Sequence, residues 1–119
     1  MKAKVINLNA KTVSNKISNH TMNGYLNLGE KFTVYAITIM EDVTYLQIYL
    51  NNNLISVPSD LFEIIDSKVS KYWKFKKEDD SISFWPEEFY DDYFHDDLLE
   101  EIPERVKQFA DIKKRIDNE

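Results

Sequence analysis

The fold of this chain is decided by residues 32–50, where FTVYAITIM (32–40) and VTYLQIYL (43–50) flank Glu41-Asp42. Both runs are dense in β-branched and aromatic residues, which favour strands. A gap of two residues predicts a β-hairpin, although without the Asn-Gly signature a longer or bulged loop stays open. Because both alternating faces are largely apolar, we expect two central strands that are covered on both sides.

Shorter strands are predicted on either side of this hairpin. Residues 2–8 show the alternation of a half-buried strand. Residues 51–53 are three asparagines, which tolerate turn conformations, and residues 54–57 form a strand closed by Pro58. Residues 61–65 fit either a further strand or a helical turn. The N-terminal two thirds is therefore expected to consist of strands with mostly tight connections.

One more hairpin is predicted from residues 71–84. Residues 71–76 alternate, which places Trp73 and Phe75 on an inward face, and Ile82 with Phe84 continues that buried face after a turn. Five or six short strands in sequence predict an antiparallel meander that curls into a small, partly open barrel.

The last third of the chain changes to a helical period. Pro86 opens a segment with two glutamates in its first turn, which the helix dipole favours, and Pro103 starts a second helix. The apolar stripe expected on this second helix consists of Val106, Phe109, Ala110, Lys113 and Ile116. We expect this stripe to dock on an open face of the sheet.

The sequence thus predicts an α+β fold, a small bent antiparallel sheet or partly open β-barrel with a C-terminal helix. The 119 residues are expected to form a single domain, 1–119. Within it, residues 9–30 are predicted to be a mobile connection, residues 31–85 a β-rich core, and residues 86–119 a helical C-terminal part.

Composition indicates a globular protein of a reducing compartment. Apolar residues make up 43% and charged residues 30% of the chain, and cysteine is absent, which excludes disulfides and thiolate sites. No stretch is apolar enough for a transmembrane helix, and the N-terminus lacks the apolar region of a signal peptide. We therefore expect a cytoplasmic protein that does not bind membranes.

The most distinctive feature is an acidic block, residues 78–104, which contains no lysine or arginine. It holds twelve of the 21 acids, while all 15 basic residues lie outside it. Residues 72–94, which overlap it, hold nine of the 16 aromatic residues. The net charge of −6 argues against general nucleic-acid binding. The uneven distribution of the charges says more than their total, because it gives the domain one acidic part and one basic part.

Carboxylates next to aromatic anchors are typical of a surface that recognises a basic protein. If the segment is helical, Phe89 and Tyr93 share one face. The predicted partner-binding residues are Trp85, Glu87, Glu88, Tyr90, Asp91, Asp92, Tyr93, Asp96 and Asp97. Two alternatives remain open: the acids form a solvated face above buried aromatics, or they pair with Lys71, Lys74, Lys76 and Lys77.

Other chemistries have weaker support in the sequence. Asp91, Asp92, His95 and Asp96 offer hard ligands at one-turn spacing, so a small metal-dependent enzyme is an alternative. No catalytic residue, resident metal or cofactor is predicted, because no nucleophile motif or glycine-rich phosphate loop is present. Residues 71–77 mix lysines with aromatic residues, as single-strand binders do, but the adjacent acids would repel phosphate.

Three segments carry a resemblance: LGEKFTVY (28–35), VPSDLFEIID (57–66), and Tyr72-Trp73 with Phe84-Trp85-Pro86. From about residue 31 onward the chain resembles a group of small uncharacterised bacterial proteins. Some of these carry the label phosphoribosylaminoimidazole synthetase, which does not suit a chain this short without a nucleotide-binding loop. The chain is also similar in general character to immunity proteins of bacterial polymorphic toxin systems. That similarity implies a binding module for a basic toxin domain; an accessory or structural subunit is the further alternative.

Overall fold

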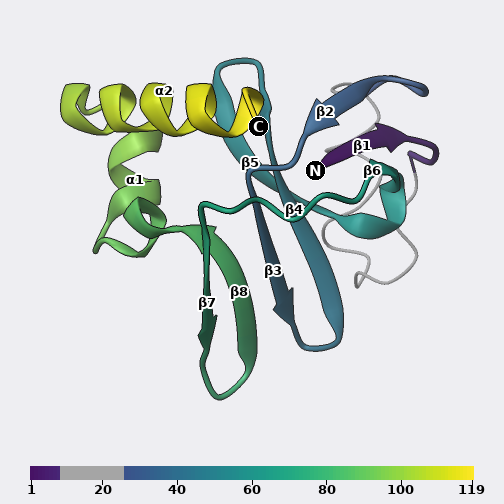
Figure 1. Ribbon diagram of the computed structural model, residues 1–119, viewed down its shortest axis with the longest axis horizontal. Helices are drawn as coiled ribbons and strands as arrows, with labels where there is room; N and C mark the ends of the chain where they lie inside the picture. Colours follow the sequence, from purple (N-terminus) through teal and green to yellow (C-terminus); the bar gives the residue numbers. More distant parts are fainter. Residues whose placement is uncertain (9–25) are drawn as a thin grey trace.

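The computed structural model describes residues 1–8 and 26–119 and shows an α+β fold with two antiparallel sheets (Figure 1). The three-stranded sheet has the order β2 (Lys31–Thr33), β1 (Lys2–Val5), β6 (Phe62–Asp66). The five-stranded sheet has the order β5 (Asn53–Pro58), β4 (Val43–Leu50), β3 (Ala36–Met40), β8 (Ser81–Pro86), β7 (Trp73–Lys77). The predicted fold class is confirmed.

Residues 9–30 were predicted to be a mobile connection, and of these, residues 9–25 lie outside the described residues. The residues that follow are tied to β1. Leu26 is buried, and Gly29 N–H donates to the carbonyl of Val5 at 2.8 Å. Gly29 has a φ of +84°, a conformation that glycine adopts without steric penalty.

Both hairpins around β4 have two-residue loops. Met40 pairs with Val43 across Glu41 and Asp42, whose φ values are 52° and 65°. Leu50 pairs with Asn53 across Asn51 and Asn52, whose φ values are also positive. Positive φ at both loop residues matches the right-handed twist of the strands, so tight hairpins form even without Asn-Gly. The predicted two-residue hairpin and the asparagine turn are confirmed.

The stretch 32–40 does not form one strand. Phe32 and Thr33 belong to β2 in the small sheet, whereas Ala36 begins β3 in the large sheet. Between them, Val34 N–H donates to Met1 and Tyr35 N–H donates to Gln47, so backbone pairing changes partner within two residues. The chain therefore crosses between two sheets, and the described sheets stay open rather than closing into a barrel.

Both alternating faces of β4 are apolar because each face packs in a different core. Leu46 and Ile48 pack in a core shared with the small sheet, together with Val5 and Trp73. Tyr49 packs on the other side, against a core formed with the helices. Figure 1 shows the small sheet and the helices on opposite sides of the large sheet. The predicted double coverage is confirmed.

In the β7–β8 hairpin, the predicted inward face of Trp73 and Phe75 is only partly buried. Trp73 is buried and donates its indole N–H to the carbonyl of Tyr35 at 2.8 Å. Phe75, predicted to point inward, is 61% exposed, and its ring contacts Phe84 at 5.4 Å between centroids. β7 is an edge strand, and the far end of the hairpin projects beyond the small sheet (Figure 1).

The segment after Pro86 is not the continuous helix that was predicted. It consists of a 3₁₀ turn, η2 (Glu87–Tyr90), and a short helix, α1 (Phe94–Leu99). Tyr93 separates them in a left-handed conformation with φ 63°. Residues 59–66 combine both predicted alternatives, since the 3₁₀ turn η1 (Ser59–Leu61) leads directly into β6.

The C-terminal helix α2 (Pro103–Asp117) docks on the large sheet, as predicted. Its buried residues are Phe109, Ile112 and Ile116, which pack against Tyr35. The Tyr35 hydroxyl also donates to Asp117 Oδ1 at 2.7 Å. No helix within the described ranges is both long and apolar enough to cross a bilayer.

The predicted stripe on α2 is only partly correct. Phe109 and Ile116 are buried, but Val106 is 44% exposed and Ala110 is also exposed. The buried side of α2 is centred on Ile112, and Val106 and Ala110 lie outside it.

Candidate functional site

A cleft of about 330 Å³ lies between the end of β8, η2 and the start of α1, and we call it the acidic–aromatic cleft. Six of the predicted partner-binding residues line it: Trp85, Tyr90, Asp91, Asp92, Tyr93 and Asp96. The structure therefore brings together most of the residues that the sequence singled out, although they do not share one helix.

Two of the predicted aromatic anchors form a rigid wall of this cleft. The rings of Trp85 and Tyr90 stack with centroids 4.9 Å apart. Trp85 donates its indole N–H to Thr38 Oγ1 at 2.8 Å, and the Tyr90 hydroxyl donates to the carbonyl of Lys74 at 2.6 Å. Their polar atoms are thus bonded within the protein, and the ammonium of Lys76 lies over the Tyr90 ring, 5.5 Å from its centroid.

Tyr93 differs from both, because its side chain is 73% exposed. The left-handed backbone of Tyr93 is rare for a bulky residue and carries strain. Phe89, predicted to share a face with Tyr93, is instead 2% exposed and stacks on Phe94 in the core. Phe89 therefore lies in the core, whereas Tyr93, at the break, points into solvent.

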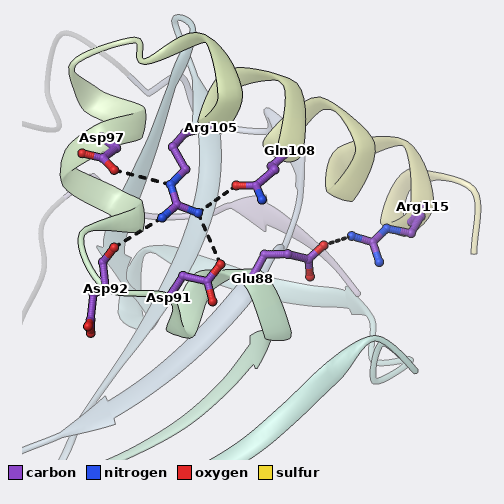
Figure 2. A network of polar contacts seen from close by, with 7 residues as sticks. All are labelled: Glu88, Asp91, Asp92, Asp97, Arg105, Gln108 and Arg115. Atoms are coloured by element: carbon purple, nitrogen blue, oxygen red, sulfur yellow. Dashed lines mark hydrogen bonds and ion pairs between the residues drawn. The ribbon is translucent and has the colours of Figure 1, made fainter.

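Several acids of the block are paired within the molecule, by arginines of α2 (Figure 2). Arg105 donates to Asp97 Oδ2 at 3.4 Å and to Asp91 Oδ2 at 3.3 Å. It also donates to Gln108 Oε1 at 2.9 Å and to the backbone carbonyl of Asp92 at 3.4 Å. Its guanidinium lies over the ring of Phe94, 5.4 Å from the centroid.

Two further ion pairs involve acids of the block. Arg115 forms an ion pair with Glu88. Of the four lysines predicted to pair with the acids, Lys76 does so, with Glu78 at 3.2 Å. The main internal partners are thus Arg105 and Arg115, which the sequence did not single out.

Three of the six predicted partner-binding acids remain unpaired among the described residues. Glu87, Asp92 and Asp96 are exposed, and their carboxylates make no ion pair with any other described residue. Together with Tyr93 they form what we call the acidic–aromatic surface. Glu88, Asp91 and Asp97 contribute to it with charges that arginine partly neutralises.

His95 closes the inner end of the cleft and is largely buried. Its Nε2 lies 3.2 Å from Gln47 Oε1, and since an amide oxygen accepts, the ring N–H donates. Three aromatic rings surround the imidazole, and those of Trp85 and Phe89 lie 5.2 Å away. Burial lowers the pKa of His95, and the charge of Asp96 opposes that effect.

The metal-ligand set considered above does not converge. Asp91 is engaged by Arg105, and the Nε2 of His95 faces Gln47. In residues 1–8 and 26–119, no three His, Cys, Asp or Glu side chains gather as metal ligands would. The metal-dependent alternative therefore gains no geometric support from these residues.

No protein-family model matches this chain, and no curated protein or solved structure is significantly similar to it.

The burial of His95 predicts a loss of stability in mild acid. The unfolded chain takes up the imidazole proton near its ordinary pKa of about 6.5, whereas the folded chain takes it up only at lower pH. The stabilising effect is therefore complete above about pH 6.5 and decreases as the pH falls. Urea unfolding at about pH 7.5 and pH 5.5 measures this difference.

The His95→Gln variant provides the control, because it retains an amide donor but does not titrate. Its stability should change less between the two pH values than that of the wild type. Equal pH dependence in wild type and His95→Gln would contradict the assignment.

Proposed function

We propose that this protein is a cytoplasmic protein-binding module of the immunity type, which neutralises a basic partner protein such as a toxin domain. One observation carries the proposal: Tyr93 is 73% exposed between free carboxylates, although its own backbone conformation is strained. Strain of this kind persists only where surrounding structure imposes it, and it clusters at functional positions. The partner would dock on the acidic–aromatic surface.

The chemistry of this surface suits a cationic partner. Tyrosine is enriched at interface hot spots because it buries a large area with few rotatable bonds. Free carboxylates at Glu87, Asp92 and Asp96 would attract lysines and arginines and speed their approach. The stacked wall of Trp85 and Tyr90 is fixed before binding, which limits the entropy lost on association.

The internal pairing decides which charges the partner would meet. Asp91 and Asp97 hold Arg105, so lysine at either position would disturb the fold as well as the surface. Asp92 and Asp96 present carboxylates that no described residue pairs. Charge reversal at these two positions therefore tests binding with the least structural damage.

The experiment first captures the partner from the native host and then measures its affinity. The captured protein is identified, purified and titrated with three forms of this chain at two salt concentrations. We expect Asp92→Lys/Asp96→Lys to weaken binding by about a hundredfold and to flatten its salt dependence. Matched reversal at two exposed acids elsewhere, Asp79→Lys/Asp111→Lys, should change the affinity by less than about threefold.

Two results would overturn the proposal. One is equal affinity for both double variants, which would mean that net charge alone, or another surface, determines binding. The other is a captured partner that is acidic. Circular dichroism of each variant establishes that the fold is intact before the affinities are compared.

A further inference from the structure

A second hollow, separate from the proposed partner surface, lies where α2, α1 and the β4–β5 hairpin meet. It measures about 690 Å³, and we call it the helix groove. Its apolar lining includes Tyr49, Leu54, Leu98, Leu99, Val106 and Ala110. Apart from His95, no residue lines both hollows.

The part of the predicted α2 stripe that is not buried against the sheet lines this groove. Val106 and Ala110 lie one helical turn apart, on the side of α2 that faces the groove. Val106 is 44% exposed, and Leu99 on α1 is 70% exposed. Apolar side chains exposed around a hollow, rather than scattered singly over a convex surface, indicate a binding site.

The charges at the groove favour an anionic group. Lys107 and Lys113 line it, against one acid, Glu101. Lys113 is already paired with Asp117 at 2.7 Å and lies over the ring of Tyr49. Lys107 is exposed and makes no ion pair or cation–π contact with any other residue that the structure describes. Its ammonium is therefore available to a ligand.

We propose that the helix groove binds an amphipathic carboxylate, with the acyl chain on the apolar lining and the carboxylate at Lys107. The volume falls within the range of about 300–1,000 Å³ that small-molecule sites occupy. The lining holds one lysine that no described residue pairs, Lys107, and one acid, Glu101, which suits one negative charge rather than two. This site would be independent of the proposed protein partner.

The test uses decanoate and the uncharged decanol as probes of the folded wild-type chain. Isothermal titration calorimetry below the micellar concentration should give saturable binding of decanoate at one site. Lys107→Glu should weaken decanoate binding by about tenfold and leave decanol binding nearly unchanged. Lys114→Glu is the matched control, because Lys114 is exposed on α2 but does not line the groove.

Two further variants separate the apolar and the charged contributions. Ala110→Trp should fill the groove and abolish binding of both probes while the melting temperature stays close to that of the wild type. Glu101→Gln should strengthen decanoate binding and leave decanol binding unchanged, because it removes the one acid of the lining.

Three outcomes would overturn the proposal. The first is the absence of saturable decanoate binding to the wild type. The second is an equal effect of Lys107→Glu and Lys114→Glu on decanoate. The third is unaltered binding by a folded Ala110→Trp variant. None of these outcomes bears on the protein partner, since the acidic–aromatic surface is unchanged in every variant.

Discussion

Replacing Phe94 by alanine is expected to lower the free energy of unfolding by about 3–5 kcal/mol. Phe94 is 1% exposed and stacks on Phe89 with ring centroids 5.0 Å apart. The guanidinium of Arg105 covers its ring, and His95 contacts its edge. Truncation would leave a cavity that these neighbours, held by their own contacts, cannot fill.

The effect should extend to α1. This helix has six residues, too few to be stable without tertiary packing, and Phe94 is its only fully buried side chain. We therefore expect the variant to lose helical signal at lower urea concentration than the wild type. Because Asp92, Tyr93 and Asp96 flank Phe94, the acidic–aromatic surface would lose its fixed geometry as well.

Phe75→Ala provides the matched control, since it removes the same side chain from an exposed site. Phe75 is 61% exposed, so its loss should lower the free energy of unfolding by about 1 kcal/mol or less. Urea unfolding followed by tryptophan fluorescence measures both variants. Equal destabilisation would show that the far end of the β7–β8 hairpin is covered in solution.

The parts of the fold that were predictable from sequence are those fixed by local chemistry. The β-branched runs in residues 36–50 and the two-residue spacing at Glu41-Asp42 predict the hairpin that the structure shows. The apolar character of both faces of β4 likewise follows from the sequence, because each face needs a cover.

The parts that were not predictable depend on contacts between distant residues. The change of sheet at Val34-Tyr35 is set by Met1 and Gln47, which accept their backbone hydrogen bonds. Phe75 is exposed while Trp73 on the same strand is buried, because Phe75 lies nearer the loop end of the β7–β8 hairpin, and alternation within one strand cannot reveal this difference. The break at Tyr93 opposes the helical spacing of the neighbouring residues, and no glycine marks it.

In the candidate site, too, local composition was predictable and contacts between distant residues were not. The composition of the sequence identifies the acidic block, but it could not show which of the carboxylates in that block are free. That is decided by Arg105 and Arg115, which lie on α2 and reach back to η2 and α1. The available signal was weak: Arg105 is the first basic residue after the block and lies eight positions beyond Asp97.

Replacing Arg105 by methionine is expected to lower the free energy of unfolding by about 1–2 kcal/mol. The Asp91 contact contributes little of this, because that carboxylate is 53% exposed and water screens it. The larger share comes from Asp97 and Gln108 and from packing on Phe94, since the Arg105 side chain is 19% exposed. Methionine retains much of the apolar stem, so the measured loss reports mainly the polar contacts.

Lys107→Met is the control for this substitution, because it removes a positive charge two residues along the same helix. It should change the unfolding free energy by less than about 0.5 kcal/mol. A double-mutant cycle with Asp97→Asn separates the ion pair from the packing: the coupling should be positive and should decrease with added salt.

Arg105→Met is also expected to change the rate at which a basic partner binds, in a direction that a loss of stability alone would not produce. It releases Asp91 and Asp97 from their partner and makes the region around Asp92 and Asp96 more negative. If a basic protein docks there, its association rate should increase at low salt even though the folded state is less stable. A variant that is both less stable and slower to bind would show that Arg105 matters by holding α1 in place rather than by neutralising charge.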